Sequence, residues 1–292
     1  MNGEAASFSW LQWHFHLEVV IVLLLLEGVY LWGVGPLRRR FGWAEEVEAK
    51  QVAWFTGGVI VLYIALTSSI HELADSFLFS AHMVQHLLLV LIAPPMLLVG
   101  TPGWLMRPIF RSQPVRRAVR FVTHPLAAFL VFNAILGIWH FPFLYDLTLR
   151  SHAPHILEHL LFIGGAVIGW WPILSPTTEV PRASYPIQIL YLFGMSLPMG
   201  IIGAAITFSP HVLYPWYGAV PRLWGISATT DQQVAGLIMK IPGALFYLVF
   251  MTAIFFAWFN KDESGQGETG LEELIGPEES PQEAGRLMPP LP

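Results

Sequence analysis

The chain contains no cysteine, and only 12% of its 292 residues are Asp, Glu, Lys or Arg. The absence of cysteine excludes disulfides, Fe–S clusters, thiolate zinc sites and cysteine nucleophiles. Because the charged fraction is about half that of a soluble domain, much of the surface must face something other than water. The sequence has no dense run of basic residues that could bind a nucleic-acid phosphate backbone, so we expect no nucleic-acid partner. With 54% hydrophobic residues, the composition instead predicts an integral membrane protein in contact with the lipid bilayer.

A helix that crosses a bilayer needs about 20 mostly apolar residues. Seven stretches meet this requirement, near residues 13–34, 51–70, 80–100, 123–140, 155–174, 187–209 and 233–259. The first is too long for the apolar region of a cleaved signal peptide, and it carries Glu18 and Glu27. The sequence therefore predicts an all-α polytopic membrane protein, with seven transmembrane helices in a domain over residues 1–260. Residues 261–292 are acidic, rich in Gly and Pro, and poor in aromatics, which predicts a disordered tail.

The distribution of Lys and Arg predicts how the bundle is oriented. Twelve of these bases follow the first, third, fifth and seventh stretches, whereas the N-terminal segment and the other loops contain two. Because basic loops remain in the cytoplasm, we expect the N-terminus outside and the C-terminal tail in the cytoplasm.

The histidines are distributed as unevenly as the bases. With the predicted topology, His124 is the one histidine on the cytoplasmic side. The ten on the outer side are His14, His16, His71, His82, His86, His140, His152, His155, His159 and His211. Single histidines near a membrane surface are usually amphipathic interfacial residues, and this interpretation suits His14, His16, His152 and His211.

Two pairs of histidines predict a metal site. His82 and His86 are four residues apart, as are His155 and His159, so each pair projects from one face of its helix. Imidazole suits copper, zinc, iron and nickel. The predicted core consists of these four histidines, completed by His71 or His140. Glu158 and Asp231 are predicted to orient the ring N–H groups as acceptors, and Asp231 and Glu72 could serve either as ligands or as such acceptors.

Other side chains carry less weight as ligands. Thioethers select copper(I), but methionines in apolar helices are usually core residues, and this applies to Met195 and Met199. The common catalytic motifs are absent from the sequence. The order His155-Ile-Leu-Glu-His159 differs from the His-Glu-x-x-His of metalloproteases. We therefore expect no enzymatic activity.

Several motifs together resemble a known family. They are Ala81-His82-Met83-Val84-Gln85-His86-Leu87-Leu88 with Pro94-Pro95, Trp139-His140 with Pro142, His155-x-x-Glu158-His159, Trp170-Trp171-Pro172, and Asp231-Gln232-Gln233 continuing to Met239. This combination resembles the integral-membrane CtaG family of bacterial cytochrome c oxidase assembly factors. The resemblance extends from about residue 10 to residue 260.

The resemblance implies a multi-pass protein of the bacterial cell membrane that is needed to form active haem–copper oxidase. The implied partners are subunits of the oxidase and a soluble copper carrier, and the implied metal is copper, with haem b or zinc as alternatives. Three other classes remain open. They are a b-type cytochrome with two axial histidines, a copper transporter, and a metalloenzyme built on a histidine cluster.

Overall fold

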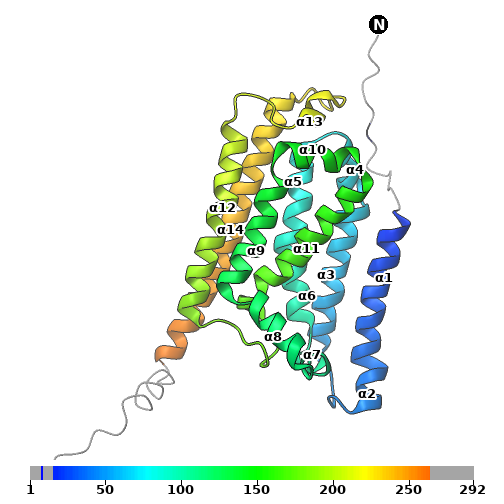
Figure 1. Ribbon diagram of the computed structural model, residues 1–292, viewed down its shortest axis with the longest axis vertical. Helices are drawn as coiled ribbons and strands as arrows, with labels where there is room; N and C mark the ends of the chain where they lie inside the picture. Colours follow the sequence, from blue (N-terminus) through cyan, green and yellow to red (C-terminus); the bar gives the residue numbers. More distant parts are fainter. Residues whose placement is uncertain (1–7, 9–15, 264–292) are drawn as a thin grey trace, which may run out of the picture.

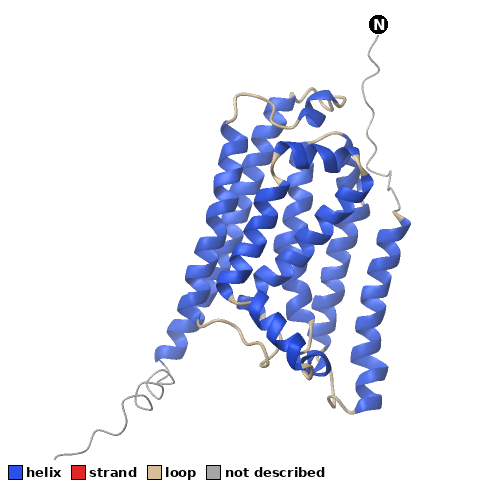
Figure 2. Cartoon of the chain, viewed as in Figure 1, coloured by secondary structure: helices blue, strands red, loops and turns tan. Residues whose placement is uncertain are grey.

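The computed structural model describes residue 8 and residues 16–263 (Figure 1), and every regular element in this part of the chain is a helix (Figure 2). Six segments are long and apolar enough to cross a membrane. They are Leu17–Phe41, Ala49–Thr67, Phe79–Gly100, His152–Leu174, Tyr185–Phe208 and Ala228–Asp262. A seventh is the pair Gln113–Val122 and Pro125–Trp139, bent by 67°, if the pair counts as one span. The prediction of an all-α multi-pass protein is confirmed.

Each segment consists of one or more helices. They are α1 (Leu17–Trp32), η1 (Gly33–Leu37) and α2 (Arg38–Phe41); α3 (Ala49–Thr67); α5 (Phe79–Leu87), η2 (Leu88–Ile92) and α6 (Ala93–Gly100); α8 (Gln113–Val122) and α9 (Pro125–Trp139); α11 (His152–Leu174); α12 (Tyr185–Phe208); and α14 (Ala228–Glu263). Because α14 continues to Glu263, the helical domain extends past residue 260. His14 and residues 264–292 lie outside the described residues, so the disordered tail remains a prediction.

Short helices cover the two ends of the bundle. α4 (Ser69–Ser76), α10 (Pro142–Arg150) and α13 (Pro215–Ala219) lie at one end, and α7 (Gly103–Phe110) lies with α2 and α8 at the other (Figure 1). We call the first the histidine end, because every described histidine except His124 belongs to its helices and loops. The opposite end carries Arg38–Arg40 and the arginines of α7 and α8.

A break in the third segment connects it to α11. Pro94 has no N–H, so the carbonyl of Val90, four residues earlier, loses its intrahelical donor. The chain forms the wide turn η2 at this point, and the indole Nε1 of Trp170 on α11 donates to the Val90 carbonyl at 2.9 Å. This contact fixes α5 and α6 against α11.

Glycines allow α14 to pack closely against α12. A Cβ atom on Gly236 would lie 2.5 Å from the carbonyl oxygen of Gly203, which is too close for any side chain. α14 also packs against α5, and this places Asp231, in the first turn of α14, beside the start of α5. The site described below depends on this placement.

Candidate metal site

The helices α5 and α11 bring the two predicted histidine pairs together. The rings of His86 and His159 lie 6.0 Å apart between centroids, and Nε2 of His86 lies 3.9 Å from Oε1 of Glu158. Two groups of three residues have ligand atoms that all lie within 4.8 Å of one another: His82, His86 and Glu158, and His155, Glu158 and His159. We call these five residues the histidine–carboxylate cluster. The sequence predicted Glu158 only as an acceptor that orients ring N–H groups, but in the structure its carboxylate lies among the ligand atoms of both groups.

Most polar atoms of this cluster are buried without a hydrogen-bond partner in the described part of the chain. They include both ring nitrogens of His82 and of His86, both carboxylate oxygens of Glu158, and Nε2 of His159. Each such group costs about 1–3 kcal/mol when it is buried and unsatisfied, so folded proteins have few of them. A metal ion fits either group of three, because it would accept one lone pair from each residue of that group.

His140, one of the two residues predicted to complete the core, presents a free lone pair. Its Nδ1 lies 2.7 Å from the carbonyl oxygen of Leu136, which can only accept, so Nδ1 carries the ring proton. In the neutral ring Nε2 is then unprotonated, and it is buried without a described partner. The ring lies 6.4 Å from that of His86. His140 therefore has the tautomer that a metal ligand requires.

His71, the other candidate, has the opposite tautomer. The side-chain nitrogen of Gln85 donates to the carbonyl of Ala65 at 2.9 Å, and the same nitrogen lies 2.9 Å from Nδ1 of His71. Nδ1 must therefore accept, and the neutral ring carries its proton on Nε2, which lies 3.5 Å from Oδ2 of Asp75. In this arrangement the proton on Nε2 of His71 faces Asp75, and Nε2 has no lone pair to offer a metal.

Asp75 is a site residue that the sequence interpretation missed. Its Oδ2 also lies 3.5 Å from Nδ1 of His155, and it forms a third compact group with His71 and His155. Burial raises the pKa of the Asp75 carboxyl well above its ordinary value, and the charge of Glu72 raises it further. The spacing of four residues from His71 repeats that of the histidine pairs and could have indicated Asp75. Glu72 belongs to none of the three groups found among the described residues.

Asp231 has a different role from the predicted one. Its carboxylate accepts from the backbone N–H groups of Phe79 and Ser80, at 2.7 and 3.1 Å, rather than from an imidazole. These are free N–H groups of the first turn of α5, where negative charge is favourable. Asp231 therefore fixes the start of the helix that carries His82 and His86, and the expectation that it orients a ring is corrected.

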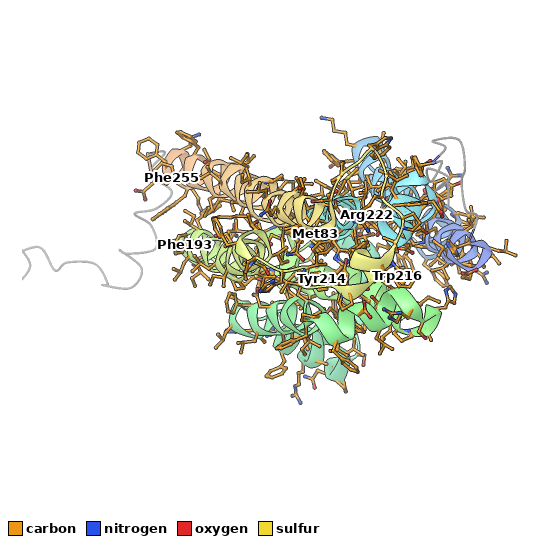
Figure 3. The ribbon with its side chains drawn as sticks, turned by 90° about the horizontal axis from the view of Figure 1, so that it is seen from above. Met83, Phe193, Tyr214, Trp216, Arg222 and Phe255 are labelled. Atoms are coloured by element: carbon orange, nitrogen blue, oxygen red, sulfur yellow. The ribbon has the colours of Figure 1, made fainter. Side chains whose placement is uncertain are left out.

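Aromatic side chains of α10 and of residues 214–217 cover the cluster at the histidine end. The ring of Tyr145 lies 5.0 Å from that of His82, and the hydroxyl of Tyr214 donates to the carbonyl of His140 at 3.1 Å. Burial raises the pKa of the Tyr145, Tyr214 and Tyr217 hydroxyls, so they stay protonated. In the view onto this end, Tyr214 lies over the middle of the bundle (Figure 3). On this side, the cover separates the cluster from water.

A side opening connects the cluster to the surface. A cavity of about 80 Å³ is lined by His16, Glu18 and His152 together with Asp75 and His155. The exposed fraction of the side chains falls from 65% at His152 and 34% at His16 to 13% at His155. Polar side chains thus follow one another from the surface to the cluster.

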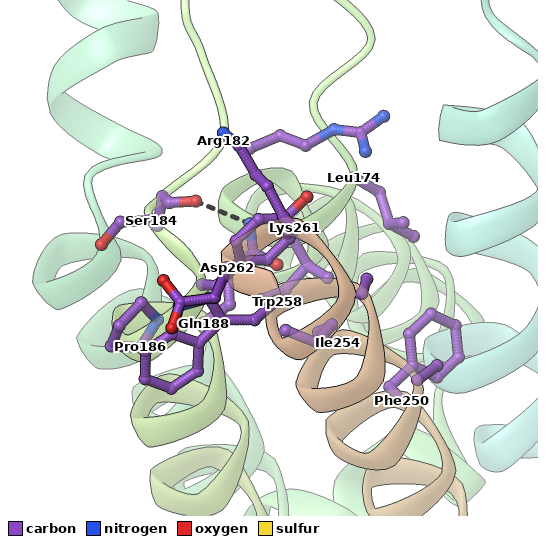
Figure 4. Close-up of a pocket in the computed structure, with 15 residues that line it drawn as sticks. Leu174, Arg182, Ser184, Pro186, Gln188, Phe250, Ile254, Trp258, Lys261 and Asp262 are labelled. Atoms are coloured by element: carbon purple, nitrogen blue, oxygen red, sulfur yellow. Dashed lines mark hydrogen bonds between the residues drawn. The ribbon is translucent and has the colours of Figure 1, made fainter. Parts of the chain in front are cut away.

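A much larger cavity lies elsewhere in the described part of the chain. It has about 760 Å³ and lies at the opposite end, between α11, α12 and α14 (Figure 4). Its walls are mainly aliphatic and aromatic, with Arg182, Gln188, Lys261 and Asp262 among the polar lining residues, and none of the described histidines lines it. The candidate metal site is therefore the cluster at the histidine end.

The fold and the site define a multi-pass helical membrane protein with a buried group of histidine and carboxylate ligands near one end. Comparison with known families identifies the family within this class. The family described as cytochrome c oxidase caa3 assembly factor (CtaG) matches residues 28–261, and the chain belongs to this family.

Curated relatives are found in mycobacteria. The chain is 27% identical over 270 residues to uncharacterized proteins of Mycobacterium bovis and Mycobacterium tuberculosis, covering 86% of this chain and 40% of each relative. It is 26% identical over 229 residues to an uncharacterized protein of Mycobacterium leprae, covering 73% of this chain and 34% of that protein. The chain thus spans less than half the length of these relatives. No solved structure matches it.

Proposed function

We propose that this protein takes part in the assembly of a haem–copper cytochrome c oxidase by binding copper, as cargo, at the histidine–carboxylate cluster. Membership of the assembly-factor family supports the assembly role. Copper binding rests on one observation, the concentration of buried and unpartnered imidazole and carboxylate atoms at His82, His86, Glu158 and His159. On this proposal Asp75 orients His155, as carboxylates commonly orient histidine ligands.

The size of the cavities favours an ion over a haem group. Pockets for organic cofactors have about 300–1,000 Å³. The two cavities beside the cluster have about 80 and 10 Å³. Imidazole ligands suit both copper and zinc, and membership of a cytochrome c oxidase assembly-factor family favours copper. A site without thiols also suits an oxidising compartment.

The bases favour an outward orientation of the site. Arg38–Arg40 and the arginines of α7 and α8 lie at the end opposite the histidines. Because basic loops stay in the cytoplasm, the histidine end would face the outside of a bacterial cell membrane. The partners would then be the copper-receiving subunit of the oxidase and a soluble copper carrier on that side.

Elemental analysis combined with a visible spectrum tests the proposal. We expect protein purified in detergent from copper-supplemented cells to contain near-stoichiometric copper without a haem Soret band. A His82→Ala/His86→Ala double variant should lose the metal, and the matched control His211→Ala, in an exposed loop of the same end, should keep it. Zinc in place of copper would overturn the metal assignment, a Soret band would indicate a cytochrome, and the absence of any metal would refute metal binding.

A further inference from the structure

A second set of metal-binding side chains lies beside the histidine–carboxylate cluster. Met83 on α5, Met199 on α12 and Met239 on α14 line one small cavity together with His86 and His140. The cavity has about 10 Å³, which is room for about one water-sized sphere or a single ion. The side chains of all five residues are buried. Figure 3 shows Met83 near the centre of the bundle.

The convergence of these three methionines on one cavity distinguishes them from ordinary core methionines. They come from three helices that are distant in the sequence, although methionines in apolar helices usually serve as core residues. Met195 shows the ordinary case. It lies one turn from Met199 on α12, its sulfur is 3.5 Å from Nδ2 of Asn133, and it does not line the cavity.

An unpartnered nitrogen also lines the cavity. Nε2 of His140 carries the free lone pair described above, and the ring nitrogens of His86 have no partner among the described residues. The rest of the lining consists of apolar residues such as Leu136 and Phe162. The cavity therefore offers thioether and imidazole ligands and no negative charge.

We propose that this cavity is a copper(I) site, formed by the thioethers of Met83, Met199 and Met239 and by Nε2 of His140. Thioether ligands select copper(I) over divalent ions. An uncharged ligand set in an apolar wall favours the monovalent ion, because burying charge without compensation is costly and the cost grows with charge. His86 contributes to both sites, so copper(I) would pass from the cluster into the cavity by ligand exchange, without electron transfer. The inference rests on the proposed function.

X-ray absorption at the copper edge tests this site. Full-length protein in detergent is loaded anaerobically with copper(I), and we expect sulfur in the first coordination shell. A Met83→Leu/Met199→Leu/Met239→Leu variant, which nearly conserves volume, should lose the sulfur shell. Loss of an outer-shell partner lowers metal affinity by roughly 10–100-fold. Because the triple variant loses direct ligands, its copper(I) affinity should fall by at least that factor. The matched control Met195→Leu should change neither.

The wild-type spectrum decides the inference even if the triple variant does not fold. A shell of nitrogen and oxygen alone would overturn the copper(I) cavity and leave copper binding at the histidine–carboxylate cluster standing. Unchanged sulfur scattering in a folded triple variant would also overturn it. Failure of the wild type to bind any copper or zinc would refute the proposed function and the cavity together.

Discussion

Replacing Glu158 with leucine should stabilise the metal-free protein and abolish its stabilisation by metal. The Glu158 side chain is fully buried, and neither carboxylate oxygen has a hydrogen-bond partner among the described residues. An unsatisfied buried polar group costs about 1–3 kcal/mol, so an apolar side chain of similar volume should raise the free energy of unfolding by about that amount. Glu158 also belongs to both ligand groups of the cluster. The variant should therefore lose the metal contribution, which is about 2.7 kcal/mol at 100 times the Kd.

Thermal unfolding in detergent, with and without chelator, measures both effects. Glu158→Gln is the matched control. It keeps two polar atoms at the same place, so it should weaken metal binding without gaining stability. If Glu158→Leu lowers the stability of the metal-free protein, the carboxylate stabilises the fold itself, and the argument from unpartnered atoms is refuted.

Four further variants test other parts of the structure. Asp75→Asn should weaken metal affinity by about 10–100-fold, as loss of an orienting carboxylate does, and an unchanged Kd from metal titration would contradict that role. Trp170→Phe leaves the Val90 carbonyl unsatisfied and should lower the free energy of unfolding by about 1–3 kcal/mol in detergent, with metal content unchanged; unaltered stability would show that the indole contact is dispensable. The sequence has no cysteine. In whole cells a membrane-impermeant maleimide should therefore label a His211→Cys variant but not a Ser112→Cys variant, and the reverse pattern would invert the proposed orientation.

The membrane segments were predictable because apolar length is a local property. The stretch predicted near residues 80–100 is Phe79–Gly100 in the structure, and the one near 155–174 is His152–Leu174. The stretch near 123–140 corresponds to Pro125–Trp139, but the 67° bend to the preceding helix was not predicted. A bend depends on contacts between helices, which the hydropathy of one segment does not contain.

The site was predictable where it depends on the spacing within one helix. The pairs His82/His86 and His155/His159 each place two imidazoles on one face, and the structure brings the two faces together. Met239 could not be found in this way, because its relation to the histidines exists only after α14 has packed against α5. The tautomers of His71 and His140 likewise depend on acceptors and donors in the folded chain.

The unpartnered atoms of the cluster persist because α5 is fixed at two points. At its start the carboxylate of Asp231 accepts from two backbone N–H groups, and just beyond its end the indole of Trp170 donates to the Val90 carbonyl. With both points fixed, His82 and His86 cannot turn toward water without breaking buried hydrogen bonds that stabilise the helix. On the proposed function, the ligands would thus be held in position before the metal binds, as rigid positioning of ligands requires. Trp170 and Asp231, from motifs far apart in the sequence, thus both position the helix segment that carries the two histidines.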